Sequence, residues 1–278
     1  MHNFESGNGR FPSQNIFAHE TPGNVTVKNV PGGTAGGVAL EASYSFITQL
    51  LPQFEEGDLF ENIDFDLNPF VTTNGKYSGT KISVLQCPSF TGKRETIAQD
   101  YSVYLNPSWS APRKPMLTQY LAMGATTRNN LFRDGATTTD GEPDGFIHSG
   151  TAPIRDGTIA DGMAKTIMLA ETKEKRYATW MDGTTASMFG LTADGQTTLN
   201  RGWLSAPYIA AADFGGTEDW EWGPSSMHAD MAHHAFGDGA VRSVLDDIQA
   251  TVYRALITKD SKVQYGVSDA KQVEDFFN

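Results

Sequence analysis

The stretch from Met227 to Leu245 constrains the fold of this 278-residue chain most, because it predicts a β-hairpin. Asp238-Gly239 is a strong signal for a two-residue turn of type I′, which needs positive φ at both central positions. Short half-apolar runs flank this turn, and Ala232 to Phe236 supplies the first of the two strands. The sequence therefore predicts an antiparallel pair of strands near the C-terminal end.

The same stretch is rich in metal-ligand residue types and holds three of the six histidines. If Ala232 to Phe236 is a strand, His233 and His234 point to opposite faces and cannot bind one ion. We therefore predict a structural role, in which Asp238 accepts backbone N–H bonds in the turn and His228 hydrogen-bonds across to a loop. On this interpretation the chain has no catalytic residue, no metal and no cofactor. The candidate ligands considered are His228, Asp230, His233, His234 and Asp238.

Composition and motifs disfavour several function classes. The net charge of −12 argues against a nucleic-acid partner, because nucleic-acid binders concentrate Lys and Arg. The chain has no run of eighteen apolar residues, so no transmembrane helix is predicted. It also has no Gly-x-Ser-x-Gly elbow, which would indicate a nucleophilic serine. Cys87 is the single cysteine and precedes a proline in an apolar run, where a thiolate is poorly stabilised. We expect a non-enzymatic protein in which Cys87 packs as a small hydrophobic residue.

The rest of the chain predicts short elements separated by loops, which is typical of an α+β fold. Ser43 to Ile63 has apolar residues at spacings of three and four, so it predicts helices that divide at Pro52. Short strands are predicted at Tyr101 to Leu105 and Gln119 to Ala125, and a buried strand at Ile167 to Ala170. Gln249 to Lys259 predicts a C-terminal helix.

Two segments hold residues that could bind ligands, although we expect neither segment to do so. Arg128 to Asp161 is acidic and could supply oxygen ligands for calcium, but it lacks the EF-hand spacing and is expected to be a solvated loop. Thr179 to Trp222 holds four of the five tryptophans, which are expected to pack rather than form a ligand platform. The acidic residues are Asp134, Asp140, Glu142, Asp144 and Asp156, and the tryptophans are Trp180, Trp203, Trp220 and Trp222.

Several blocks, taken in order, resemble a family signature. The hairpin stretch carries a His-x(9)-Asp-Gly motif at His228, Asp238 and Gly239. A turn and strand run from Asp161-Gly162 to Glu171, and Cys87 opens a Cys-Pro-Ser block. In these features the chain resembles a large bacterial family of prepilin-type, processing-associated proteins whose domain has no known function. The other matching blocks are Gly9 to Pro12, Leu50 to Glu56 with Leu59-Phe60, and Val252 to Thr258.

The resemblance implies a pilin-like α+β fold in a single domain, residues 1–278. Residues 1–12 would be the end of an N-terminal helix and the following turn, packed on an antiparallel β-sheet with long decorating loops. We expect the native gene to encode an apolar helix and a basic leader with a prepilin cleavage site upstream of Met1. Many family members carry a cysteine on that helix, so the resemblance also implies a disulfide partner for Cys87. The structural signature residues would be Cys87, Asp161, Gly162, Glu171, His228, Asp238 and Gly239.

By resemblance, the chain would be a pilin- or pseudopilin-like subunit of a type IV pilus or type II secretion-like filament at the bacterial cell envelope. Its partners would be homologous subunits joined through the N-terminal helix, which would also be its membrane contact. Without that helix, a head with net charge −12 is expected to be a monomer or weak dimer. Two alternatives stay open: a carbohydrate- or solute-binding module, and a metal-dependent hydrolase using the 228–238 His/Asp cluster.

Overall fold

A computed structural model describes residues 1–17, 43–67, 69, 72–96, 114–131, 143–148, 153–175, 178–183, 185–192, 194–201, 223–261 and 276. The strands are β1 (Asn15–Phe17), β2 (Ser43–Ser45), β3 (Tyr120–Thr127), β4 (Ile167–Glu171), β5 (Ser187–Leu191), β6 (Met231–Phe236) and β7 (Val241–Leu245). The α-helices are α1 (His2–Asn8), α2 (Phe46–Gln49), α3 (Gly57–Asn62), α4 (Thr72–Ser78), α6 (Arg128–Leu131) and α7 (Ala250–Ile257). The 3-10 helices are η1 (Leu51–Phe54), η2 (Ser83–Leu85), η3 (Asp156–Thr158) and η4 (Met163–Lys165).

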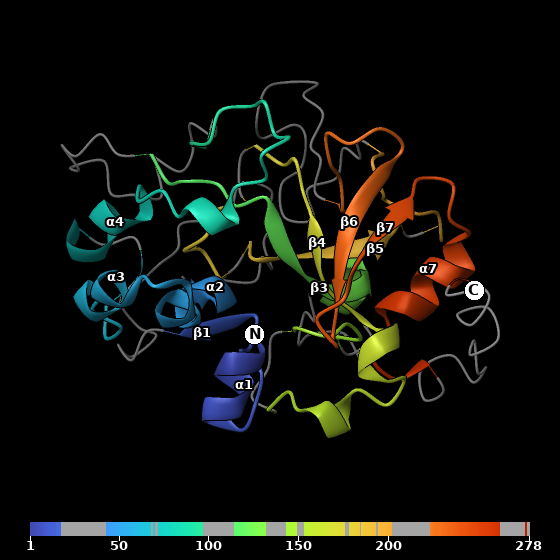
Figure 1. The fold of residues 1–278 in the computed structure, drawn as a ribbon, viewed down its shortest axis with the longest axis horizontal. Helices are drawn as coiled ribbons and strands as arrows, with labels where there is room; N and C mark the ends of the chain where they lie inside the picture. The colour runs from blue at the N-terminus through green and yellow to red at the C-terminus, as the bar shows by residue number, and fades with distance from the viewer. Residues whose placement is uncertain are drawn as a thin grey trace, which may run out of the picture.

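A five-stranded sheet with the order β5-β3-β4-β6-β7 forms the centre of the molecule, and β1 pairs with β2 in a separate small sheet (Figure 1). The α+β class is confirmed. The expectation of a fully antiparallel sheet is wrong at one pair, because β3 and β5 are parallel. β5 pairs with the edge of β3 that faces away from β4. Both β3 and β5 run in the direction opposite to β4, so they are parallel to each other.

Helices cover both faces of the sheet. On one face α7 packs against β3, β4 and β5 and buries Tyr253, Leu256 and Ile257, in a cluster we call the α7 core. On the other face the N-terminal helices bury residues such as Phe46 and Leu50, in a cluster we call the N-terminal core. In Figure 1, α2, α3 and α4 lie to the left of the sheet and α7 lies to its right. The sheet is thus the middle layer of three.

Strand β3 shows how the alternation of side chains feeds both cores. Leu121 and Met123 lie in the α7 core, whereas Ala122 between them lies in the N-terminal core. This alternation follows from the two-residue period of a strand. A strand was predicted over Gln119 to Ala125, and β3 confirms it with a small shift of its bounds.

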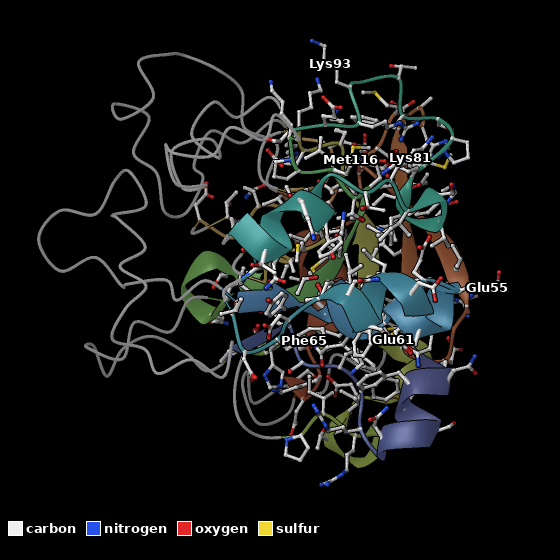
Figure 2. All side chains as sticks on the ribbon, turned by 90° about the vertical axis from the view of Figure 1, so that its left-hand side faces the viewer. Glu55, Glu61, Phe65, Lys81, Lys93 and Met116 are labelled. Atoms are coloured by element: carbon white, nitrogen blue, oxygen red, sulfur yellow. The ribbon has the colours of Figure 1, made fainter. Side chains whose placement is uncertain are left out.

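The predicted helical segment from Ser43 to Ile63 is confirmed in part. It begins as β2, continues as α2 with an N-cap bond from the Thr48 N–H to Ser45 Oγ of 3.2 Å, and then divides. Pro52 lies at the start of η1, where a missing N–H costs nothing. Figure 2 shows this side of the molecule, with Glu55 and Glu61 on its solvent-exposed surface.

The β6–β7 hairpin is confirmed, but its predicted type I′ turn is wrong. The Gly239 N–H donates to Phe236 O at 2.9 Å, and Phe236 N–H donates to Ala240 O at 2.8 Å, so the loop has three residues. Gly239 has a φ of 87°, whereas Asp238 is not among the residues with positive φ. A type I turn followed by a left-handed glycine gives this arrangement. The N–H groups of Gly237 and Asp238 are held by Thr166 O and Met163 O, which fixes the longer loop against η4.

Asp144 contradicts the expectation that the acidic segment is solvated. Its side chain is fully buried and accepts bonds from Thr126 N at 2.7 Å, from the Thr126 hydroxyl, and from Asn130 Nδ2 at 2.8 Å. Its carboxylate therefore satisfies polar groups at the end of β3 and in α6. Asp156 is exposed as expected.

Other sequence expectations have mixed outcomes. Trp180 is 1% exposed, so it packs in the N-terminal core as predicted. Within the described ranges, no helix combines the length and apolar character needed to cross a bilayer. The predicted features outside the described residues are the strand at 101–105, Trp203, Trp220, Trp222, Asp134, Asp140 and Glu142.

Candidate functional site

Three residues from distant parts of the chain meet beside the sheet: Cys87, Glu171 and His228. The Cys87 Sγ lies 3.5 Å from Glu171 Oε1, and His228 Nε2 lies 3.6 Å from the same oxygen. One ligand atom from each residue lies within 4.8 Å of the others. A thiol, a carboxylate and an imidazole are thus gathered around one point.

Glu171 holds the central position because it is the last residue of β4. The residue is 4% exposed, and its Oε2 accepts the backbone N–H of His233 from β6 at 2.8 Å. This bond orients the carboxylate so that Oε1 faces Cys87 and His228. The strand pairing of β4 with β6 therefore determines the direction of the carboxylate.

Cys87 is placed by the turn that follows η2. Arg94 Nη2 donates to Cys87 O at 2.9 Å and to Phe90 O at 2.8 Å, and Arg94 Nη1 donates to Gln119 Oε1 at 2.7 Å. The guanidinium thereby joins this turn to the start of β3. Cys87 is buried, as expected, but its Sγ faces a carboxylate rather than apolar side chains alone.

His228 is placed by the short turn before β6. Its N–H donates to Ser226 Oγ at 3.0 Å, and that hydroxyl donates to Met231 O at 2.6 Å. The imidazole ring also lies against the ring of His233, with centroids 4.7 Å apart. His228 was predicted to reach across to a neighbouring loop; the structure places it against the end of a strand.

Tyr120 borders the same cluster. Burial, followed by the nearby Cys87 and Glu171 charges, raises the pKa of Tyr120 to about 12. The phenol therefore keeps its proton at neutral pH and remains a hydrogen-bond donor beside the thiol and the carboxylate.

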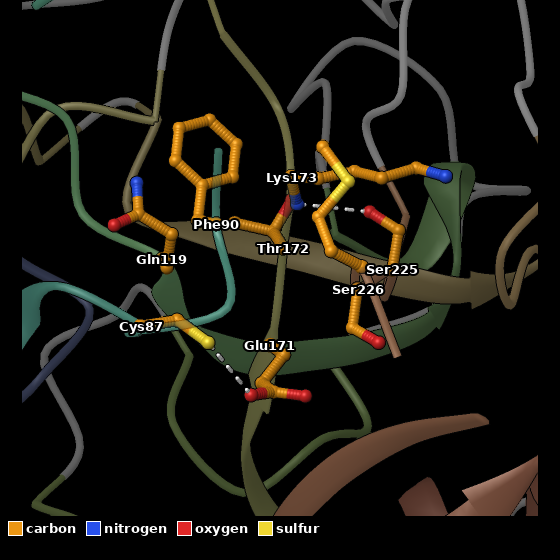
Figure 3. Close-up of a pocket in the computed structure, with 9 residues that line it drawn as sticks. Cys87, Phe90, Gln119, Glu171, Thr172, Lys173, Ser225 and Ser226 are labelled. Carbon is orange, nitrogen blue, oxygen red and sulfur yellow. Dashed lines mark hydrogen bonds between the residues drawn. The ribbon is translucent and has the colours of Figure 1, made fainter. Parts of the chain in front are cut away.

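A small pocket opens next to Cys87 and Glu171 (Figure 3). The empty space there is about 180 Å³ with open solvent included, and its exposed lining is mostly apolar, although Gln119, Thr172 and Ser225 lie around it. Ser225 Oγ accepts the Lys173 N–H at 3.1 Å on the far wall. The cluster thus has one side with room for about one water molecule.

The 228–238 His/Asp cluster considered in the sequence is not brought together as one site. His234 is buried on the other face of β6, where Nε2 lies 2.8 Å from the Tyr253 hydroxyl, while His233 Nδ1 lies 3.1 Å from Ser243 Oγ. Asp230 and Asp238 are exposed, and Asp238 Oδ1 accepts the Ala240 N–H at 2.9 Å. The prediction that His233 and His234 face opposite sides is confirmed.

The remaining signature residues form a second group at the far end of the hairpin. Asp161 accepts the Ser261 N–H at 2.8 Å, the Ser261 hydroxyl at 3.0 Å and the Thr258 hydroxyl at 3.3 Å. Gly162 has a φ of 96°, which favours glycine at the turn into η4. Asp161 therefore fastens the segment after α7 to the start of β4.

The sequence identified Cys87, Glu171 and His228 one by one but did not predict that they meet. The three came from separate blocks of the family resemblance. Only the register of β4 with β6, and the turn after η2, brings them into contact.

Comparison with known proteins agrees with that resemblance at the level of the family. Residues 1–251 match a family model described as a protein of unknown function, DUF1559. No curated protein and no solved structure matches the chain.

Proposed function

The chain belongs to the DUF1559 family of proteins of unknown function, and we propose that it acts as a pilin-like or pseudopilin-like structural subunit. In this role it is the head of a subunit in a type IV pilus or type II secretion-like filament at the bacterial cell envelope. It carries out no chemical reaction and contacts homologous subunits through an N-terminal helix.

The way α1 is fastened to the head carries this proposal. Phe4 is 8% exposed and belongs to the N-terminal core. The helix ends at Gly9, whose N–H donates to Glu5 O at 2.7 Å and whose O accepts Arg155 Nε at 3.2 Å. A helix of this length is not stable alone, so its packing on the head maintains it. The end of a long pilin-type helix would be attached to its head in this way.

The pocket geometry favours a structural role over a hydrolase. Pockets that bind small-molecule substrates usually measure about 300–1,000 Å³, whereas the one beside Cys87 has room for about one water molecule. The described part of the Trp-rich segment also gives the solute-binding alternative no support, because Trp180 is buried.

The test uses the natural gene expressed in its own host, with mass spectrometry of the mature N-terminus and fractionation of sheared cell-surface filaments. We expect a processed N-terminus that begins an apolar helix, and recovery of the protein with membranes or sheared filaments. An ordinary soluble domain upstream of Met1, or an unprocessed protein outside both fractions, would contradict the proposal.

A second measurement concerns the isolated chain of residues 1–278. With net charge −12, these heads repel each other at neutral pH, so light scattering at modest salt should give a monomer or a weak dimer. A stable closed oligomer would mean that the head carries its own large interface, which would count against assembly through the helix.

A further inference from the structure

We propose that Cys87, Glu171 and His228 bind one divalent transition-metal ion of the zinc class, with a fourth coordination position facing the adjacent pocket. This proposal does not rest on the filament role, since a structural subunit and an enzyme can both hold such an ion, and it requires Cys87 as a free thiol rather than in a disulfide. It rests on the spacing of the three ligand atoms, their chemistry and the surrounding hydrogen bonds.

The spacing around Glu171 Oε1 suits a tetrahedral ion. Zinc bonds of about 2.3 Å to sulfur, 2.1 Å to oxygen and 2.0 Å to nitrogen place S and O about 3.6 Å apart, and N and O about 3.4 Å apart. The corresponding distances are 3.5 Å from Cys87 Sγ and 3.6 Å from His228 Nε2. The third pair of ligand atoms, Cys87 Sγ and His228 Nε2, lies within 4.8 Å.

Direct hydrogen bonds explain the same geometry less well. A charge-assisted N–H···O bond is normally about 2.7–2.9 Å long, so 3.6 Å between His228 and Glu171 is too long for one. The S–H of Cys87 is a weak donor. Glu171 Oε1 is thus a buried carboxylate oxygen that faces a weak donor, the Cys87 thiol, and a distant imidazole, that of His228. A cation between the three groups would satisfy it.

The donor set selects a class of metal. Thiolate and imidazole prefer zinc and similar ions, whereas calcium and magnesium prefer ligands that are all oxygen. A thiolate and a carboxylate also neutralise a divalent ion, which reduces the cost of burying its charge. Cys87 and Glu171 are both buried, so this compensation matters here.

Neighbouring groups hold the ligands in the required orientation. The His233 N–H fixes Glu171 Oε2, and Arg94 fixes the carbonyl of Cys87. Such outer partners orient metal ligands and adjust their basicity.

The fourth coordination position follows from the position of the pocket. Cys87 and Glu171 both line it, and the side chains of Gln119, Thr172 and Ser225 lie around it (Figure 3). Three protein ligands with an exchangeable water in the fourth position fit this arrangement. The ion would join the turn after η2, the end of β4 and the turn before β6.

The experiment starts from the purified chain, reduced and made metal-free with a chelator. Zinc is then titrated with a competing indicator, and cobalt(II) is added separately as a spectroscopic probe. We expect about one zinc per chain, a thiolate-to-cobalt charge-transfer band, and visible bands of four-coordinate intensity. Zinc should also raise the melting temperature, because it binds the folded state preferentially.

The variants Cys87→Ser, Glu171→Gln and His228→Gln should each weaken zinc binding by more than the roughly 10- to 100-fold typical of losing an outer partner. Cys87→Ser should abolish the charge-transfer band. His2→Gln is the matched control, because His2 is exposed on α1 and should leave zinc binding unchanged. Circular dichroism confirms that each variant is folded.

Two results would overturn the proposal. The first is a folded wild-type chain that retains no zinc and shows no cobalt charge-transfer band. The second is equal zinc affinity in folded wild type and in the three ligand variants, which would mean that the ion binds elsewhere.

Discussion

His234 predicts a specific loss of stability in weak acid. The residue lies on β6 with Nε2 2.8 Å from the Tyr253 hydroxyl of α7 and Nδ1 3.0 Å from Ala232 O. Complete burial lowers the pKa of His234 to about 4, although the Ala232 carbonyl opposes this shift. The imidazole is therefore neutral in the folded protein throughout the physiological range.

The size and sign of the effect follow from linkage between protonation and folding. The unfolded chain binds a proton at this histidine below about pH 6.5, whereas the folded chain does so only near pH 4. The stabilisation that neutral His234 contributes is therefore fully present above pH 6.5 and is lost as the pH falls towards 4. At about 1.4 kcal/mol per pH unit, the whole window corresponds to about 3 kcal/mol.

The assay is equilibrium denaturation by urea between about pH 7.5 and pH 5, in the wild type and in His234→Gln. Glutamine does not ionise, so the stability difference between the two proteins should fall by about 2 kcal/mol over this range. His2→Gln, at an exposed residue of α1, is the control for replacing a histidine elsewhere. Parallel profiles for wild type and His234→Gln would refute the reasoning.

Two further predictions concern backbone geometry. Asp238→Ala removes the acceptor of the Ala240 N–H and should lower the free energy of unfolding in urea by about 1 kcal/mol, without changing any activity. Unchanged stability together with lost metal binding would instead place Asp238 in a metal site. Gly145→Ala should cost about 3 kcal/mol or more, since its Cβ would lie 2.4 Å from the backbone of Gly124. Gly157→Ala, with open space around the new methyl group, should change stability by less than about 0.5 kcal/mol, and equal losses in both variants would contradict the packing argument.

The elements predicted from the sequence are those with a clear local pattern. β4 was predicted from a short apolar run that follows a turn, β6 from the half-apolar run before Asp238-Gly239, and α7 from apolar residues on one helix face. β5 was not predicted, because all five of its residues are buried and no polar alternation marks it. Gly190 within it lies so close to Ile257 and Tyr253 that an added Cβ would clash, a constraint that only the packed structure reveals.

The turn and the buried aspartate show a different limit. Asp238-Gly239 predicts a turn, but the choice between two- and three-residue loops depends on Thr166 O and Met163 O, which hold the neighbouring N–H groups. Asp144 was expected to be a solvated loop residue, but its carboxylate accepts bonds from Thr126 at the end of β3 and from Asn130 in α6. Both outcomes are decided by tertiary hydrogen bonds rather than by local propensity.

The candidate site could be predicted residue by residue but not as an assembly. Cys87 and Glu171 are 84 residues apart, and each taken alone has an ordinary structural explanation. Their contact depends on strand register, and a slip of one residue would turn Glu171 to the opposite face. A single sequence carries no signal for that register beyond the burial pattern.

The position of α7 determines the order in which this protein can fold. α7 is the last helix described before residue 261, yet it covers β3, β4 and β5, which are made much earlier. β5 must also be in place beside β3 before Tyr253 and Ile257 can pack on it. A chain emerging from the ribosome therefore lacks the α7 cover on β3, β4 and β5 until residues up to Ile257 have left the ribosome. Such exposed faces favour aggregation, so the nascent protein most needs a chaperone before α7 packs on the sheet.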